Sequence, residues 1–226
     1  MEATLSEKIA LFLVLIGSLS VHEWAHAFAA DKMGDPTPRA QGRLTLNPLA
    51  HIDMLGTVII PLTMILLAPG FVILGWGKPV IIDPKNFKNP ALGDILTSMA
   101  GPLSNLILAL IVASVFGVSL GFMHDGETAE KVGNLGVQII ALNAMLAAFN
   151  LIPIPPLDGS HVLRYLVGMS EMAFFKFAQW GSLILIILIN IDAFQVLLGK
   201  LITLLSVPFI GIMELMAGLM TKAAGA

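Results

Sequence analysis

The pentapeptide His22-Glu23-Trp24-Ala25-His26 has the residue types and the spacing for hydrolytic metal chemistry. Residues four positions apart lie on one face of a helix, so the imidazoles of His22 and His26 can share one divalent cation. Glu23, beside them, can take up and return a proton. The motif lies in an apolar stretch, where ionisable groups are costly unless they are paired or bound to a metal. The alternative is a polar cluster that serves only helix packing.

Two histidines leave a catalytic zinc one protein ligand short, because hydrolytic sites use three and keep a further position for water. The best remaining carboxylate is Asp158, which follows the proline-rich run 152–157. Prolines free backbone groups, and these are tolerated at membrane depth only inside protein or beside a water-filled cavity. Gly159 lets the backbone turn closely beside the carboxylate. An Asx-type turn that caps the next helix remains an equal alternative for Asp158.

The composition indicates that these residues work in a bilayer. Of 226 residues, 57% are hydrophobic and only 12% are charged, against about 25% charged in a typical soluble domain. The mean hydropathy is +0.89. A net charge of -3 lacks the basic excess of a nucleic-acid binder, so no nucleic-acid partner is expected. Cysteine is absent, so a metal site must use His, Asp or Glu.

A helix that crosses a bilayer needs about 20 apolar residues. Such stretches predict membrane helices at about 5–30, 95–122, 134–151, 174–191 and 193–220. The shorter stretch 55–68 contains Pro61 and is expected to turn back. An amphipathic helix is expected near 160–167, a short strand at 39–46, and a hairpin or re-entrant loop within 70–90.

The sequence therefore predicts an all-α polytopic membrane protein with about five to six transmembrane helices. A small β or re-entrant element is expected between the first helix and the helix at 95–122. We expect one membrane-embedded domain over 1–226, with a catalytic core at about 5–170 and C-terminal helices at about 171–222.

Four motifs in this order resemble those of the site-2 protease family of intramembrane zinc metalloproteases. They are His22-Glu23-Trp24-Ala25-His26, Gly75-Trp76-Gly77-Lys78-Pro79, the Gly-Pro-x-x-Asn helix start Gly101-Pro102-Leu103-Ser104-Asn105, and Asn150-Leu151-Ile152-Pro153-Ile154-Pro155-Pro156-Leu157-Asp158-Gly159. The chain is similar to the short form of the family, without a PDZ or CBS domain.

The resemblance implies roles for individual residues. His22, His26 and Asp158 would be the ligands of one Zn²⁺, and Glu23 would be the catalytic base. The resemblance also suggests that Asn150 and Asn105 help to position the substrate strand or the oxyanion.

The function expected from this resemblance is an intramembrane endopeptidase. It would use a zinc-activated water to hydrolyse peptide bonds in or near transmembrane segments, as in regulated intramembrane proteolysis, with transmembrane proteins as substrates. The competing hypothesis is a membrane metal transporter or sensor that binds zinc without hydrolysis. Glu23 separates the two, because hydrolysis needs a carboxylate beside the ligands and transport gains little from one.

Charge distribution predicts the orientation of this multi-pass chain in the cell membrane. Cytoplasmic loops carry an excess of Lys and Arg, which places the N-terminus outside and the active site open toward the cytoplasm. The expected inside segments hold Lys32, Arg39, Arg43, Lys78, Lys85, Lys88 and Arg164, and the expected outside loop holds Asp125, Glu127, Glu130 and only Lys131.

Two further histidines keep open roles at this point. His161 follows Asp158 by three positions, so it is either a partner that supports the ligands or a helix-start residue near the membrane surface. His51 is expected at the membrane interface rather than in the ligand set.

Overall fold

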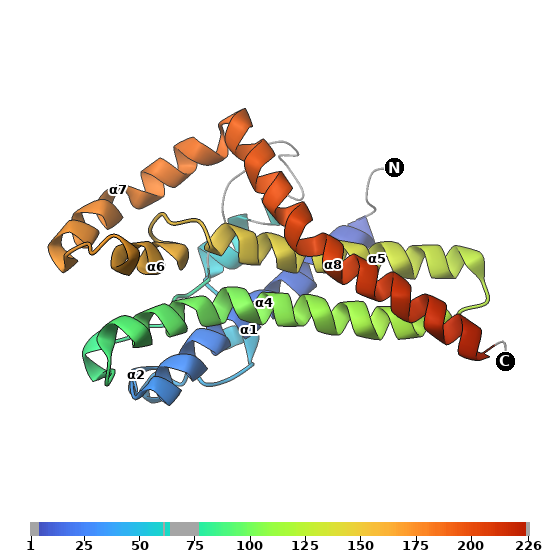
Figure 1. The fold of residues 1–226 in the computed structure, drawn as a ribbon, viewed down its shortest axis with the longest axis horizontal. Coiled ribbons are helices and arrows are strands. Elements are labelled where there is room, and N and C mark those ends of the chain that lie inside the picture. The colour runs from blue at the N-terminus through green and yellow to red at the C-terminus, as the bar shows by residue number, and fades with distance from the viewer. Residues whose placement is uncertain (1–4, 61, 64–76, 225–226) are drawn as a thin grey trace.

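A computed structural model describes residues 5–60, 62–63 and 77–224 of the chain (Figure 1). Five helices in this part are long and apolar enough to cross a membrane: α1 (Leu5–Met33), α4 (Pro90–Gly121), α5 (Gly126–Asn150), α7 (Glu171–Ile189) and α8 (Asp192–Ala224). Shorter helical elements lie between them: α2 (Thr37–Ala40), η1 (Pro48–Ala50), η2 (Met54–Ile59), η3 (Pro84–Asn86) and α6 (Gly159–Leu166). The described residues contain no strand. The predicted helical membrane fold and its five long helices are confirmed.

Local sequence signals set where the long helices begin and end. The side chains of Asn89, Asp125 and Ser170 each accept a backbone N–H in the first turn of the helix that follows. Such caps satisfy N–H groups that have no partner within the helix. Helix α5 ends at Asn150, just before the prolines at 153, 155 and 156, since proline cannot donate to a helix ladder.

Helix α4 is the centre of the bundle and contacts α1, α5 and α8. A Cβ on Gly117 would lie 2.5 Å from the carbonyl oxygen of Met213, and one on Gly121 would clash with Met220. These glycines therefore let α4 and α8 approach closely, with their C-terminal ends together. Figure 1 shows α8 crossing over α4 and α5 toward the end where α4 and α5 are joined.

Helices α7 and α8 meet at a corner beside the proline-rich loop. Ile152 and Leu157 of this loop form a buried apolar cluster with Leu185 and Ile189 of α7. Gly181 lets α7 lie directly against the backbone of Pro155, where a Cβ would clash. Since α8 ends beside the end of α4, α7 and α8 together carry the chain from the α6 side of the bundle to the opposite side.

The expected strand at 39–46 is wrong. Residues Thr37–Ala40 form α2 instead, and turns follow. The side chain of Asp35 accepts hydrogen bonds from the backbone N–H and the hydroxyl of Thr37, which favours a helical turn at this point. Gly42 then takes a left-handed conformation, with φ of 69°, and ends the turn.

The expected element within 70–90 has no strand in its described part, and residues 70–76 lie outside the described residues. Residues 77–83 form an irregular segment that we call the site segment. Contacts other than strand pairing hold its backbone: the N–H of Lys78 donates to the carbonyl of His51, and the Arg43 guanidinium donates to the carbonyls of Lys78 and Pro79. His51 is buried beneath this segment and lies outside the ligand group, as expected.

The stretch 55–68 is described only in part. It begins in η2, a π-helical turn capped by Asp53, whose side chain accepts the N–H groups of Leu55 and Gly56. The expectation that this stretch turns back within the membrane depends on residues 64–68, which lie outside the described residues.

Candidate metal centre

His22, His26 and Asp158 converge although Asp158 is far away in the sequence. The two histidines lie one turn apart on α1, and Asp158 directly precedes α6 at the end of the proline-rich loop. The Asp158 side chain makes no capping hydrogen bond to α6, so the alternative of a helix cap finds no support. Nε2 of His22 lies 3.3 Å from Oδ2 of Asp158, and Nε2 of His26 lies 3.3 Å from Oδ1. The two Nε2 atoms are 3.0 Å apart. All three candidate ligand atoms lie within 4.8 Å of one another, so this group could hold one metal ion.

The hydrogen bond of His26 fixes its tautomer. Its Nδ1 lies 2.7 Å from the backbone carbonyl oxygen of Thr97 on α4. A carbonyl oxygen can only accept, so Nδ1 carries the proton and Nε2 keeps a lone pair in the neutral ring. Nε2 is therefore free to bind a cation.

A chain of three side chains fixes His22 in the same way. The amide nitrogen of Asn143 donates to the carbonyl of Ile139, which can only accept. The amide oxygen of Asn143 therefore faces Asn105, and it accepts from the Asn105 amide nitrogen over 3.2 Å. The amide oxygen of Asn105 then accepts from Nδ1 of His22 over 2.7 Å. His22, like His26, presents a lone pair at Nε2.

These atoms fit a cation better than they fit one another. Two imidazole lone pairs and a carboxylate face one another in buried surroundings, with no proton left to share on either Nε2 of the neutral rings. Oδ2 of Asp158 is buried and has no hydrogen-bond donor among the described residues. Gly101 leaves the space beside them open, because a Cβ there would lie within 2.6 Å of Nε2 of His22 and would clash with Nε2 of His26. The donor set of two nitrogens and one carboxylate is typical of zinc in hydrolytic sites.

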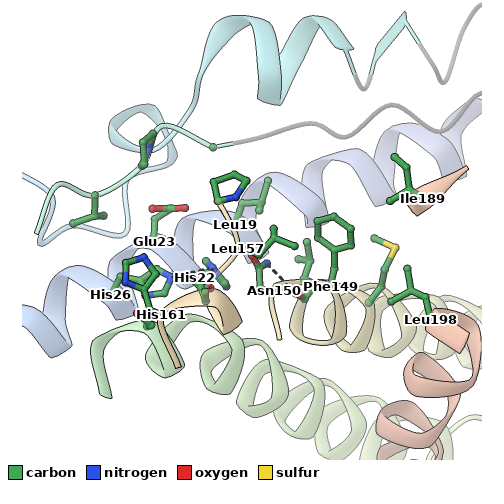
Figure 2. Close-up of a pocket in the computed structure, with 18 of the residues that line it drawn as sticks. Leu19, His22, Glu23, His26, Phe149, Asn150, Leu157, His161, Ile189 and Leu198 are labelled. Atoms are coloured by element: carbon green, nitrogen blue, oxygen red, sulfur yellow. Dashed lines mark hydrogen bonds and ion pairs between the residues drawn. The ribbon is translucent and has the colours of Figure 1, made fainter. Parts of the chain in front are cut away.

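The candidate metal centre opens into a cavity of about 950 Å³. Figure 2 shows its lining, with His22, Glu23 and His26 at one end and Phe149, Ile189 and Leu198 toward the other. Glu23 is partly buried and its carboxylate lies close to Gly77 of the site segment, where a Cβ would be 3.5 Å from Oε1. A carboxylate that lines the cavity next to the histidines can exchange a proton with water or substrate there.

The two asparagines expected near the substrate lie in different places. Asn150 lines the cavity, and its amide nitrogen donates to the Leu146 carbonyl over 2.9 Å. Asn105 is fully buried behind His22 and uses both ends of its amide for His22 and Asn143. A direct contact between Asn105 and substrate therefore finds no support in the structure, because no atom of this amide faces the cavity.

Asp94, which is not among the site residues predicted from the sequence, holds α6 in place. Nδ1 of His161 lies 3.0 Å from Oδ1 of Asp94, and both residues line the cavity. Tyr165 lies one turn further on α6, and burial together with the charge of Asp94 raises the pKa of Tyr165. Since α6 begins directly after Asp158, these contacts fix the helix that positions the carboxylate. The only signal in the sequence was a lone acidic residue near the start of an apolar helix.

Two buried charges anchor the site segment at its ends. Arg43 donates to backbone carbonyls of Ala50, Lys78 and Pro79. Asp35 is fully buried and accepts hydrogen bonds from Thr37, the N–H of Asp83 and the Asn86 side chain. The segment between these anchors contributes Gly77, Pro79, Val80 and Ile82 to the cavity wall.

Comparison with known proteins identifies the family of the chain. Residues 10–191 match the family described as peptidase family M50, so the chain belongs to this family of site-2 proteases. It is 38% identical over 185 residues to the protein named "Putative zinc metalloprotease YwhC" of Bacillus subtilis (strain 168), covering 79% of this chain and 78% of that protein. It is 28% identical over 186 residues to "Putative zinc metalloprotease Rip2" of Mycolicibacterium smegmatis, covering 80% and 68%. No solved structure gives a significant match to the chain.

Family, fold and site together define a multi-pass membrane metalloprotease. The chain is a zinc metalloendopeptidase that acts on protein substrates, and its cofactor is one zinc ion.

Proposed function

We propose that the enzyme is an intramembrane endopeptidase in which His22, His26 and Asp158 bind the zinc ion and Glu23 is the catalytic base. Its substrates would be membrane proteins that are cut in or near a transmembrane segment. The observation that carries this proposal is the convergence of the three ligand atoms within 4.8 Å inside a cavity between apolar, membrane-length helices.

Each side chain has a separate part in the proposed reaction. Zinc, when bound, supplies Lewis acidity that acidifies water and polarises the scissile carbonyl. Glu23 takes the proton of the attacking water and gives it to the leaving amine. The hydrogen bonds to Thr97 and Asn105 keep both imidazoles turned toward the metal, so no reorganisation is needed during the reaction.

The site segment is the proposed binding surface for an unwound substrate. A transmembrane helix hides its carbonyls in hydrogen bonds, so it must become extended before it can be cut. The backbone N–H and C=O groups of Val80 and Ile82 make no hydrogen bond among the described residues, and both side chains line the cavity. An extended peptide can pair with such free groups by strand addition.

Two substitutions test the proposed roles of the motif. Glu23→Gln is expected to abolish cleavage of a transmembrane test substrate in detergent and to keep zinc, whereas His22→Ala is expected to lose both. Zinc is measured by mass spectrometry of the purified protein. Normal cleavage by the Glu23→Gln variant would refute the assignment of Glu23 and would favour a protein that binds zinc without needing this carboxylate.

Proline substitutions test strand addition separately from zinc binding. Val80→Pro and Ile82→Pro each remove one backbone N–H from the site segment, so cleavage should fall while zinc content stays normal. The matched controls Val80→Ala and Ile82→Ala keep the N–H and should cleave faster than the proline variants. Equal rates for the proline and alanine variants would refute pairing through these backbone groups.

We further infer that the chain acts as one membrane domain with its N-terminus outside and its cavity open to the cytoplasm. The support for one domain is that α1, α5 and α8 all line the same cavity. The support for the orientation is the excess of Lys and Arg in the segments around the site compared with the acidic loop near Asp125.

A further inference from the structure

One face of α5 forms a continuous stripe from the middle of the helix to the candidate metal centre. Gln138, Ala141, Leu142 and Met145 line a second hollow of about 360 Å³. Met145, Phe149 and Asn150 continue the same face, at helical spacing, into the metal-containing cavity. Met145 lines both spaces, so they adjoin each other along α5.

Helices α1 and α8 form the two walls beside this stripe. Leu11 of α1 lines the second hollow, and Leu15 and Leu19 continue along the same wall to His22. On α8, Ile202 lines both spaces and Leu198 follows toward the site. We call this channel between α1 and α8, with α5 as its floor, the α5 groove.

The α5 groove starts where α8 leaves α5. Gly136 lies at the crossing of the two helices, since a Cβ there would be 2.9 Å from the sulfur of Met213. From this crossing toward the corner with α7, α8 diverges from α5, and Figure 1 shows the two helices separating on this side. The groove therefore runs from the middle of the bundle to the candidate metal centre.

Among the described residues that line the second hollow, Gln138 alone is polar. It lies 12 positions from each end of α5, at Gly126 and Asn150, which is about 18 Å at 1.5 Å per residue. Its side chain is exposed and has no hydrogen-bond partner among the described residues. Gln138 lies one turn inside the predicted membrane span 134–151, where an amide needs a partner and hydrocarbon chains offer none.

We propose that the α5 groove binds the transmembrane helix of the substrate, and that Gln138 hydrogen-bonds to a polar side chain on that helix. This inference rests on the proposed function. The helical part of the substrate would lie along α5, and the unwound part would enter the cavity near Asn150. The 12 positions that separate Gln138 from Asn150 set the register. The substrate residue that contacts Gln138 lies about 12 helical residues from the point where the substrate unwinds, and the bond that is cut lies beyond this point.

Continuity with the cavity distinguishes a substrate from other occupants. A lipid chain would fill the apolar walls but leave the Gln138 amide without a partner. A second copy of the chain would not need a groove that leads to the candidate metal centre. A substrate helix satisfies the amide, covers the apolar walls and delivers its end to the metal.

Disulfide cross-linking tests the occupant directly, because the chain has no cysteine of its own. The full chain carrying Glu23→Gln and Gln138→Cys is mixed with a transmembrane test substrate whose single cysteine is moved along its helix. Cross-links are expected at substrate positions at least 12 residues from the cleavage site mapped with the active enzyme, and at one helical face of the substrate. The matched control is Leu204→Cys, which lies on α8 close to Ile202 and is 70% exposed.

Two results of this experiment would overturn the proposal. One is cross-linking at Gln138→Cys that is no stronger than at Leu204→Cys, as expected for a groove filled by lipid. The other is a disulfide between two copies of the chain in place of a link to the substrate.

Kinetics test the hydrogen bond itself. With a substrate that carries Asn at the cross-linked position, Gln138→Leu is expected to raise KM about threefold and to leave kcat unchanged, which corresponds to one hydrogen bond between membrane helices. With Leu at that position in the substrate, the wild type and the variant should have the same KM. An equal change for both substrates, or none, would overturn the proposed contact.

Failure of this inference can be told apart from failure of the proposed function. If the wild-type chain cuts no transmembrane substrate, the proposed function fails and the groove proposal fails with it. If the wild-type chain cuts the substrate but the cross-links and the KM shift are absent, only the groove proposal is refuted.

Discussion

Nδ1 of His22 lies 2.7 Å from the amide oxygen of Asn105, a residue 83 positions further along the chain. Asn105 is fully buried, and its amide nitrogen is bound in turn to Asn143. Rotation of the Asn105 amide would break both hydrogen bonds. The orientation of a histidine on α1 is therefore set by α4 and α5, and the buried amides are stable because each finds a partner.

The first prediction concerns this contact. Asn105→Ala removes the acceptor of His22 and should lower zinc affinity about 10- to 100-fold, as losses of such supporting hydrogen bonds do. Competition with a coloured zinc chelator measures the affinity. The control is Ser114→Ala on the same helix, which removes an exposed hydroxyl bonded to Leu110 and should leave the affinity unchanged. Equal zinc affinity in the wild type and the Asn105 variant would contradict the account.

The second prediction concerns the open space that Gly101 leaves beside the two histidines. Gly101→Ala adds a Cβ within 2.6 Å of Nε2 of His22 and should prevent zinc binding and cleavage. Gly211→Ala is the matched control, since a Cβ on Gly211 meets nothing within 4 Å. Zinc content after purification distinguishes the two variants. One zinc per chain in the Gly101 variant would show that the metal lies elsewhere.

The sequence was sufficient to predict the helical elements and the ligand candidates on α1. Their signals are local: apolar runs of membrane length, and two histidines at helical spacing. The partners of these histidines could not be predicted in the same way. The Thr97 carbonyl leaves no trace in the sequence, and Asn105 could be placed only by the close packing of α4 against α1.

The third prediction concerns pH. Burial opposes the charge on Asp35, but hydrogen bonds from Thr37, Asp83 and Asn86 outweigh it and hold the pKa of Asp35 below its usual value. For a carboxyl whose folded pKa is lowered, the stabilisation is present above the unfolded value, about pH 4, and is lost as the pH falls through the folded value.

Asp35→Asn should therefore lower the unfolding temperature at pH 7. The amide nitrogen of the asparagine would face N–H and O–H groups that also donate, which lowers the free energy of unfolding by about 1–3 kcal/mol. The difference from the wild type should shrink as the pH is lowered from 6 to 3. Thermal unfolding in detergent measures this difference in unfolding temperature. The control is Glu130→Gln, which replaces a carboxylate outside the buried cluster around Asp35. A difference that is constant over this pH range would contradict an ionised Asp35.

The fourth prediction concerns topology. The close contact between Gly121 and Met220 places the C-terminal end of α8 on the same side as the loop that contains Asp125. A membrane-impermeant thiol reagent should label Asp125→Cys and Lys222→Cys in intact cells, and Lys85→Cys only after permeabilisation. Arg43 is unsuitable for this test because its buried guanidinium holds the site segment. Labelling of Lys222→Cys together with Lys85→Cys would contradict the parallel packing of α4 and α8.

Two parts of the structure that differ from or go beyond the prediction depend on buried carboxylates. The weak alternation of polar and apolar residues at 39–46 predicts a strand, but Asp35 and Gly42 favour turns there. His161 bonds to Asp94, 67 positions earlier, and this contact ties α6, the helix that follows Asp158, to α4. In both cases a buried carboxylate, rather than the hydrophobic pattern, determines the local structure.

The central claim is that His22, His26 and Asp158 hold one zinc ion. Its most direct test is the zinc content per chain of the purified wild type and of the alanine variants at these three positions, with the exposed His124→Ala as the control. The account predicts one zinc per chain in the wild type and the control, and strong loss of zinc in each of the three variants. Full zinc content in the Asp158→Ala or His26→Ala protein would contradict it.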